Sequence, residues 1–521
     1  MAFNLLEQPL IRARFRDRTA LLTLPGVFAA SMRDEVLNFQ ALRPHQRHAW
    51  HAFLVQVGTL ALLAAGRETP PDDDASWAGL LRGLTPGHDD DAPWSLVALA
   101  DRPALLQPAA ASGTAGWERR DAPDAIDTLI TARNHDVKRG AMVRARADDW
   151  LFALVTLQTM EGYSGPTWYG ISRMNGGSSS RPCVGVAPSG GPGAHLRRDM
   201  LALLALGGRT EHARDYAARD GLALTWLAPW DGQTSLTRRH LHPLYVEVCR
   251  RVRLTGDDDG LHALTATSKV PRIADKVPGG ITGDPWTPLV PDKAGPKVLT
   301  MVVESFGYRR VVATMLALPP DRAALQELRP DDDPAGLVLV IRGLVRGNSK
   351  TYGYHERRVP LSRIVQRGLK GMLLTDPDAA AVTARVELVG EIASALRMAV
   401  QVLLANGPDI LGKATEATKA KVAPFVRKLE ARVDQVFFPD LWAELEQAGP
   451  DMRHRVRADW VRWMLGQAED VLAEAERSTP RSSALRLRAR VRAQAALHGA
   501  ARRRAGKLAA YLDMREDADA A

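Results

Sequence analysis

The stretch "LLTDPDAAAV", residues 373–382, separates two parts of the chain that differ in character. Within it, Asp376 followed by Pro377 favours the start of a helix, because aspartate caps free N–H groups and proline suits the first helical position. Apolar residues recur at helical spacing after this point, whereas short mixed segments rich in Pro and Gly precede it. The sequence therefore predicts an α+β fold, with a large N-terminal mixed α/β domain with long loops over residues 1–372 and a C-terminal four-helix bundle over residues 376–521.

Helix-breaking residues give the expected boundaries within the bundle. Asn406-Gly407-Pro408 ends a first helix that covers residues 377–405, and "FFPD" at Phe437 is expected to lie just after the end of the second. A third helix carries Trp460 and its helically spaced apolar neighbours, and Thr479-Pro480 begins the fourth.

The last helix is the most basic segment of the protein. Between Arg481 and Lys507 there are nine Lys or Arg residues and no Asp or Glu. Such a row raises the local potential and releases counterions from nucleic acid. Two interpretations stay open: a solvated face of the bundle, or a stripe that contacts phosphates through residues such as Arg486 and Arg490.

The overall composition is that of a large basic protein without a disulfide framework. The 521 residues include 69 Lys or Arg and 60 Asp or Glu, and the only cysteines are Cys183 and Cys249. Two cysteines cannot build a thiolate zinc site, and they fit a reducing cytoplasm. The N-terminus does not look like a secretory signal, and the apolar run from Ala49 is expected to be a buried helix. We expect no membrane span, no cofactor and no metal.

A polar hairpin follows the strand-like run "GLVLVIRGL" of residues 336–344. The next residues, "VRGNSKTYGYHERR", turn at Gly347 and Asn348 and carry no apolar group at the tip. Ser349 and Lys350 complete the tip, which is either an ordinary exposed turn or a nucleic-acid contact. In the returning strand, Arg357-Arg358 either contact phosphates or protect the strand edge with charge.

No sequence motif establishes catalysis. The pair His135-Asp136 is similar to the metal-binding doublet of phosphohydrolases, and a metal-dependent nuclease or phosphohydrolase is the alternative function. The segment "GPTWYG" from Gly165 to Gly170 is glycine-rich but is not a Walker loop. Glycine allows close backbone approach to a ligand, and Trp168 supplies a stacking surface. Together with the basic hairpin, these features favour nucleic-acid binding over catalysis.

Several segments, taken in order, resemble the CasA family, the large subunit of the type I-E CRISPR Cascade complex. The segments are "FNLLEQPLIRAR", "TARNHDVKRG", "TMEGYSGPTWYGISRMNGGSSSRP", "TSKVPRIADKVPGGITGDPW" and "IRGLVRGNSKTYGYHERRVPL". The resemblance spans nearly the whole chain. It implies a non-catalytic, cytoplasmic subunit that recognises the protospacer-adjacent motif in double-stranded DNA, wedges the duplex open to start R-loop formation in antiviral defence, and helps to recruit the CRISPR helicase-nuclease. The implied partners are CRISPR RNA, target DNA, and the backbone, small and RNA-end-capping subunits of Cascade.

The resemblance also implies roles for individual residues. The loop that meets the 5′ end of the CRISPR RNA corresponds to Asn134, Lys138 and Arg139. The glycine loop beside the motif corresponds to residues 165–170. The remaining residues implied to contact DNA are Lys269, with Arg272 nearby, and the wedge hairpin from Gly347 to Thr351. The Gln that relatives often carry in this hairpin is absent, and Asn348 and Ser349 stand closest to its place.

Overall fold

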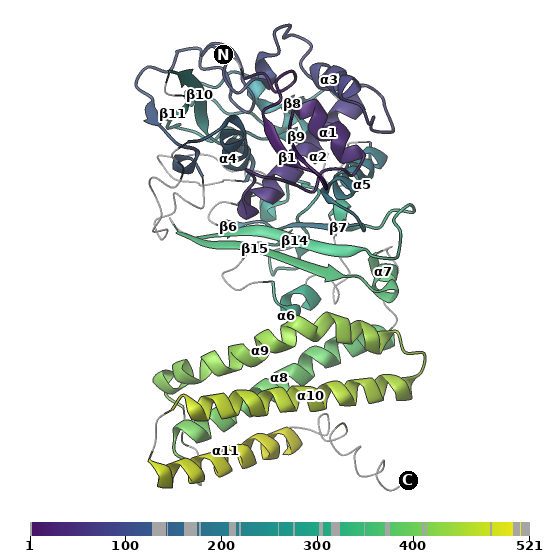
Figure 1. Cartoon of the computed structure of the whole chain (residues 1–521), viewed down its shortest axis with the longest axis vertical. Coiled ribbons are helices and arrows are strands. Elements are labelled where there is room, and N and C mark those ends of the chain that lie inside the picture. The colour runs from purple at the N-terminus through teal and green to yellow at the C-terminus, as the bar shows by residue number, and fades with distance from the viewer. Residues whose placement is uncertain are drawn as a thin grey trace. The chain divides into compact units, whose positions relative to one another are not determined.

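The computed structural model describes most of the chain. The described residues are 3–127, 142, 144–160, 175–176, 179–207, 215–217, 220–258, 260–274, 277–301, 306–313, 323–347, 350–369, 376–408, 412, 414–479, 482–503 and 511. Contacts divide the chain into two compact units, one formed by Met1–Ser305 with Pro320–Leu361 and the other by Phe306–Pro319 with Ser362–Ala521. Several small sheets and a helical C-terminal region confirm the predicted α+β class (Figure 1).

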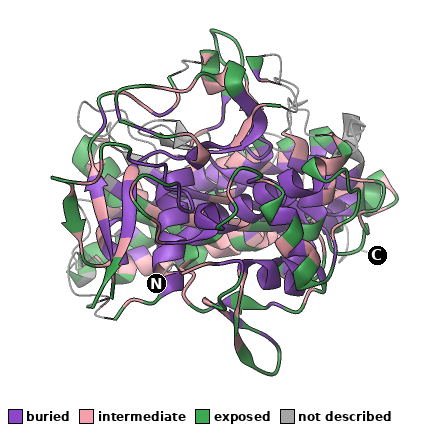
Figure 2. Cartoon of the chain, turned by 90° about the horizontal axis from the view of Figure 1, so that it is seen from above, coloured by how far each residue is buried: buried purple, intermediate pink, exposed green. Residues whose placement is uncertain are grey.

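Helices form the core of the first unit. They are α1 (Leu24–Met32), α2 (Arg47–Ala64), α3 (Asp74–Arg82), α4 (Ala147–Met160) and α5 (Pro192–Ala205). The apolar run from Ala49 lies in α2 and is almost entirely buried, as predicted. Figure 2 shows buried residues concentrated in the central helices, with exposed residues along the loops. None of the described helices is both long and apolar enough to cross a membrane.

A glycine allows α2 and α5 to pack closely. A Cβ atom on Gly58 would lie 2.4 Å from the Sδ atom of Met200 on α5 and 2.9 Å from the ring of Phe28 on α1. Both distances are too short for a real contact, so only glycine fits this position without displacement of a neighbour.

The strands form small sheets. They are β1 (Ile11–Arg14), β2 (Thr19–Leu22), β3 (Asn38–Phe39), β4 (Glu118–Arg120), β5 (Asn175–Gly176), β6 (Ser179–Ser180), β7 (Cys183–Ala187), β8 (Leu222–Leu224), β9 (Leu241–Val246), β10 (Arg251–Asp257), β11 (Gly260–Ala266), β12 (Leu289–Val290), β13 (Lys297–Val298), β14 (Val338–Gly347) and β15 (Lys350–Pro360). Two sheets have the orders β2-β1-β3 and β10-β11-β4, and the pairs β5-β6, β12-β13 and β8-β9 are two-stranded. Only β8 and β9 pair in parallel among the described strands.

The predicted hairpin is the longest pair of strands in the described structure. β14 and β15 are antiparallel, and β7 joins the other edge of β14, so the order is β15-β14-β7 (Figure 1). Gly347 pairs with Lys350, which leaves a two-residue connection at Asn348 and Ser349. The register shifts after Val345, which marks a β-bulge just before the tip. The hairpin is therefore confirmed as predicted.

The second unit contains α6 (Tyr308–Val311), α7 (Arg363–Leu369) and four long helices. The long helices are α8 (Asp376–Leu404), α9 (Glu416–Leu445), α10 (Pro450–Arg477) and α11 (Ser483–Arg503). After α8, Asn406 and Gly407 both have positive φ angles, of 62° and 70°, and so end the helix as the sequence predicts. The bundle of four helices is confirmed.

The predicted end of the second long helix was wrong. α9 continues through Pro439 to Leu445 instead of ending before Phe437. Phe437, Phe438 and Leu441 are buried, and continuing the helix places them on its packed face. Burial of these side chains outweighs the roughly 3 kcal/mol that an internal proline costs.

A short segment that precedes the hairpin in sequence packs within the second unit. Tyr308 on α6 stacks on Phe437 of α9 with ring centroids 4.4 Å apart. Its hydroxyl donates to Glu430 Oε2 at 2.6 Å, and its backbone N–H donates to Asp434 Oδ1 at 2.6 Å. Nothing in the local sequence pattern indicated this pairing, because it depends on contacts between residues more than a hundred positions apart.

Candidate nucleic-acid interface

A polar cluster fixes the base of the hairpin. Arg342 on β14 lies opposite Glu356 on β15 and donates to its Oε1 at 3.2 Å. Tyr354 donates to Glu356 Oε2 at 3.0 Å and stacks on His48 of α2, with ring centroids 5.7 Å apart. We call His48, Arg342, Tyr354 and Glu356 the hairpin-base cluster. It ties both strands to the helical core through one face of the sheet.

Burial and neighbouring groups together determine the protonation of this cluster. Burial, together with the nearby charge of Arg342, lowers the pKa of His48 to about 3, so that imidazole is neutral at pH 7. Burial also raises the pKa of the Tyr354 hydroxyl, which therefore remains a hydrogen-bond donor. For Glu356, burial alone would raise the pKa, but Arg342 and Tyr354 lower it overall and keep the carboxylate ionised.

The hairpin tip itself is only partly described. The backbone of Gly347 and Lys350 is paired, whereas Asn348 and Ser349 lie outside the described residues. At the bulge, Tyr352 is 49% exposed, and the adjacent Gly353 has a φ of 136°, which favours glycine. The strand that returns from the tip thus presents an exposed aromatic ring beside the predicted wedge.

The two arginines of the returning strand differ in exposure. Arg358 is exposed, and its guanidinium lies 4.0 Å from the Glu356 carboxylate. Arg357 is half-buried on the opposite face of β15. β15 is an edge strand, so both original interpretations, phosphate contact and edge protection, suit Arg358 better than Arg357.

Lys269 lies in a bend that follows β11 and is exposed. Its backbone N–H donates to the carbonyl oxygen of Gly232 at 2.7 Å, and the hydroxyl of Ser235 donates to the Pro271 carbonyl at 2.6 Å. These bonds hold the bend against a neighbouring loop. The structure thus presents the lysine ammonium to solvent from a backbone that is fixed.

Arg272 has a different environment from the one expected of a phosphate contact. It is 3% exposed, and its guanidinium donates to the carbonyl oxygens of Pro229, Thr225 and Ala228 at 3.1, 3.0 and 2.6 Å. It also lies over the ring of Trp230. We therefore revise the expectation for Arg272: its hydrogen-bonding groups face the protein, and it positions the bend that carries Lys269.

The remaining residues predicted for the first unit lie outside the described part of the chain. They are Asn134, His135, Asp136, Lys138, Arg139, Gly165, Trp168 and Gly170. Their roles stay predictions.

Carboxylates with little or no exposure bind neighbouring side chains near both described ends of the segment predicted to contact CRISPR RNA. At one end, Asp127 accepts from Gln46 at 2.9 Å and lies 2.8 Å from the Nε2 atom of His45. At the other, Arg12 on β1 binds Asp148 at 2.7 Å and Asp149 at 2.9 Å. The sequence analysis missed these partners, because isolated acids near a loop do not reveal which distant base they meet.

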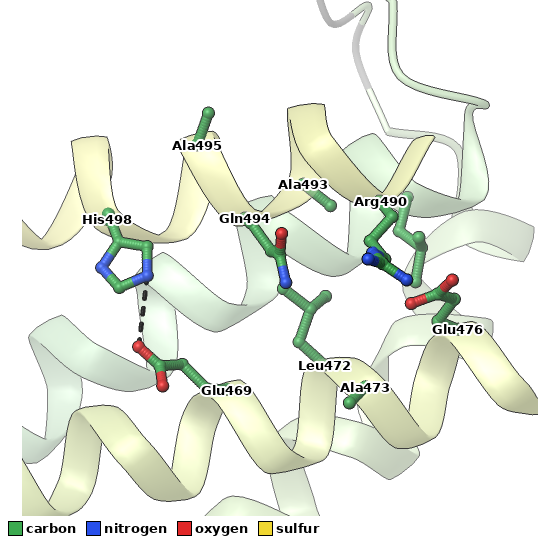
Figure 3. Close-up of a pocket in the computed structure, with 10 residues that line it drawn as sticks. Glu469, Leu472, Ala473, Glu476, Arg490, Ala493, Gln494, Ala495 and His498 are labelled. Carbon is green, nitrogen blue, oxygen red and sulfur yellow. Dashed lines mark ion pairs between the residues drawn. The ribbon is translucent and has the colours of Figure 1, made fainter. Parts of the chain in front are cut away.

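The last helix shows a mixed exposed face. Arg486 and Arg490 are exposed, and so are the apolar side chains of Leu487 and Val491. Arg490 lines a pocket of about 370 Å³ between α10 and α11, where it points toward Glu476 (Figure 3). In this pocket the carboxylate already faces Arg490, which makes Arg486 the better placed of the two for a phosphate.

The comparison with known proteins connects this geometry to a fold. No family model matches the chain, and no curated protein matches it in sequence. Solved structures do match. CasA (Cse1) from Thermus thermophilus is 17% identical with a TM-score of 0.60, covering 96% of this chain and 99% of that chain. Cse1 from Thermobifida fusca is 15% identical with a TM-score of 0.63, covering 98% of both chains.

The chain has the CasA (Cse1) fold. A chain of a CRISPR RNA-guided surveillance complex also matches, with 16% identity and a TM-score of 0.52 over 95% of this chain and 99% of that one. The similarity extends over nearly the full length, so both the mixed first unit and the helical second unit are part of it. The resemblance inferred from short segments is thereby confirmed at the level of the fold.

Proposed function

We propose that this protein is the non-catalytic large subunit of a type I-E CRISPR surveillance complex. In this role it recognises the protospacer-adjacent motif in double-stranded DNA, starts strand separation and helps to recruit the helicase-nuclease. The full-length similarity to CasA (Cse1) structures and to a chain of an RNA-guided surveillance complex supports the proposal. CRISPR RNA and the other Cascade subunits are the proposed partners.

The β14–β15 hairpin is the observation that carries the proposed mechanism. Its connection has only two residues, and its base is tied to α2 by the hairpin-base cluster. Separating a base step costs a few kcal/mol. A hairpin that separates the strands must therefore be held by contacts that do not break before the base step opens. The hairpin-base cluster, in which His48 is buried, supplies this support, while Asn348 and Lys350 offer polar groups for base edges and phosphates.

Few protein residues are needed for DNA recognition, because the guide RNA and the protein recognise different parts of the target. Guide RNA pairing reads the long target sequence, and the protein reads only a short duplex element. Edges in the minor groove distinguish A·T from G·C and little more. A tip with Asn348 and Ser349, in place of the Gln of many relatives, is therefore expected to accept several related motifs. Lys269 is proposed to contact the same duplex from its fixed bend.

The double substitution Asn348→Ala/Lys350→Ala tests the wedge. In the assembled complex it should weaken binding to a target duplex at least about tenfold, because strand separation costs a few kcal/mol, and spare a target already opened as a bubble. Lys293→Ala, which removes an exposed lysine of the same unit outside the proposed interface, is the matched control. Equal losses on duplex and bubble would exclude a wedge.

The alternative function makes a different prediction. A metal-dependent nuclease that uses His135 and Asp136 would cut DNA as the purified chain in Mg²⁺ or Mn²⁺. Cutting that His135→Ala abolishes would replace the proposal of a non-catalytic subunit. We expect no such cutting.

A further inference from the structure

Three side chains that commonly bind metals converge between α2 and α5. His51 comes from α2, and His195 and Asp199 come from successive turns of α5. Their ligand atoms all lie within 4.8 Å of one another. Because residues four positions apart project from the same side of a helix, α5 presents its imidazole and carboxylate together toward His51. None of these residues contributes to the proposed DNA interface.

Both imidazoles lie close to one carboxylate oxygen. The Nε2 atoms of His51 and His195 lie 2.9 and 3.3 Å from the same carboxylate oxygen, Asp199 Oδ2. Tetrahedral ligands with bonds of about 2.1 Å to a zinc ion lie roughly 3.4 Å apart. The two rings are stacked, with centroids 4.2 Å apart and an angle of 29° between them.

One candidate ligand atom of the cluster is a buried polar atom without a hydrogen bond. The Nε2 atom of His195 is buried and has no hydrogen-bond partner, although Asp199 is close. A buried polar atom without a partner costs about 1–3 kcal/mol. A bound cation would satisfy this atom.

We propose that His51, His195 and Asp199 form a binding site for a divalent transition-metal ion, with Zn²⁺ as the best-suited ion and water in the remaining position. Two imidazoles and one carboxylate are a donor set found in zinc and iron(II) sites, and a smaller number of ligands than four leaves room for water. No local pattern indicates this site, because 144 positions separate His51 from His195.

Arg198 is the outer partner that a metal-binding carboxylate requires. Its Nη1 atom donates to Asp199 Oδ1 at 3.3 Å, which leaves Oδ2 directed at the two imidazoles. The same guanidinium binds Asp332 and donates to the Leu325 carbonyl at 2.9 Å. Such outer contacts orient the ligand and tune its affinity.

The ion would act as a structural clip. It would join α2 to α5, and Arg198 would connect it to the segment that leads into β14. On β7, a Cβ atom at Gly185 would lie 3.9 Å from His195 Nε2, so this position leaves space beside the ligand. His51 is 15% exposed and gives the ion a path from solvent. Metal binding should then stabilise the folded unit by mass action.

Metal titration of the untagged full-length chain tests the site. After treatment with EDTA and dialysis, the protein should bind one equivalent of Zn²⁺, measured by calorimetry, and Zn²⁺ should raise its melting temperature. Co²⁺ should give the intense visible absorption of a low-coordinate nitrogen and oxygen site. His51→Gln, at the partly exposed ligand, should weaken Zn²⁺ binding by more than the roughly 100-fold upper cost of losing an outer partner.

His240→Gln is the control, because His240 is exposed in the same unit and lies outside the cluster. It should bind Zn²⁺ as the parent does. Asp199→Asn serves as a second ligand variant. Circular dichroism of the metal-free variants establishes whether each is folded. If Asp199→Asn is unfolded, His51→Gln alone tests the proposed site. Equal Zn²⁺ affinity of the parent and His51→Gln, or binding of less than one equivalent, would show a hydrogen-bonded cluster and overturn the proposal.

Discussion

Replacing Arg272 by alanine distinguishes a positioning residue from a phosphate contact. The side chain is buried and donates three hydrogen bonds to carbonyl oxygens of residues 225–229. Its own backbone oxygen accepts from Leu236 N–H at 2.7 Å, next to the bend that carries Lys269. Loss of the guanidinium should therefore make the bend more mobile, even in the absence of DNA.

The structure sets the size of the effect. Each hydrogen bond from a charged donor contributes about 1.5 kcal/mol or more, so three contribute on the order of 4 kcal/mol. Burial of the guanidinium, which lowers the Arg272 pKa to about 10, offsets part of this gain. We expect Arg272→Ala to reduce local stability by about 2–3 kcal/mol, which corresponds to roughly 30- to 150-fold faster amide exchange.

Hydrogen exchange followed by mass spectrometry measures this effect at the amides of Leu236 and Lys269. Arg272→Lys is the informative comparison, because lysine keeps the charge but has one nitrogen in place of a planar fork. A positioning role predicts fast exchange in both variants, and no additional loss of DNA binding when Lys269→Ala is combined with Arg272→Ala. Unchanged exchange in Arg272→Ala, together with DNA binding restored by lysine, would refute this reasoning.

Three other substitutions test parts of the fold. Glu444→Ala leaves the fully buried Arg385 without the carboxylate 3.1 Å from its Nε atom, and should destabilise the second unit by about 3–5 kcal/mol in urea unfolding. Burial lowers the pKa of His48 to about 3, so the unfolded state takes up the proton first as pH falls below about 6.5. The parent protein should therefore lose about 3 kcal/mol of stability by pH 4 from this residue. His48→Gln should not show this loss, and urea unfolding at several pH values measures the difference. Gly58→Ala, whose new Cβ would press on Met200, should cost about 1–3 kcal/mol and lower the melting temperature, and Met200→Ala should restore part of it.

The elements with strong local signals could be predicted from sequence. The hairpin follows from β-branched residues on both sides of Gly-Asn, and α8 follows from the Asp-Pro start and the Asn-Gly end. α9 exceeded its predicted end because a proline penalty is local, whereas the burial of Phe437 depends on helices that the sequence cannot place. Local chemistry thus predicted an end marked by a strong stop signal, as at Asn406-Gly407, and failed where packing overrides a weaker one, as at Pro439.

The candidate sites show the same limit more strongly. Lys269 was found through resemblance, yet the sequence could not distinguish its exposed ammonium from the buried guanidinium of Arg272 three residues later. The cluster of His51, His195 and Asp199 has no sequence signal, since two of its members lie on successive turns of one helix and the third requires α2 to pack on α5. Gly58 permits that packing, but its significance is visible only beside Met200.

The hairpin explains how a polar tip and a buried base can serve one function. A tip that enters a groove gains from short polar groups, but polar residues alone cannot make a two-stranded ribbon stiff. Stiffness comes from Leu344 and Val345, which are buried, and from Tyr354 and Arg342, which fix Glu356 against the core. The bulge after Val345 adds twist where the buried base gives way to the tip. Under the proposed function, a duplex that meets this tip would have to open or be released, because these contacts hold the hairpin base in place.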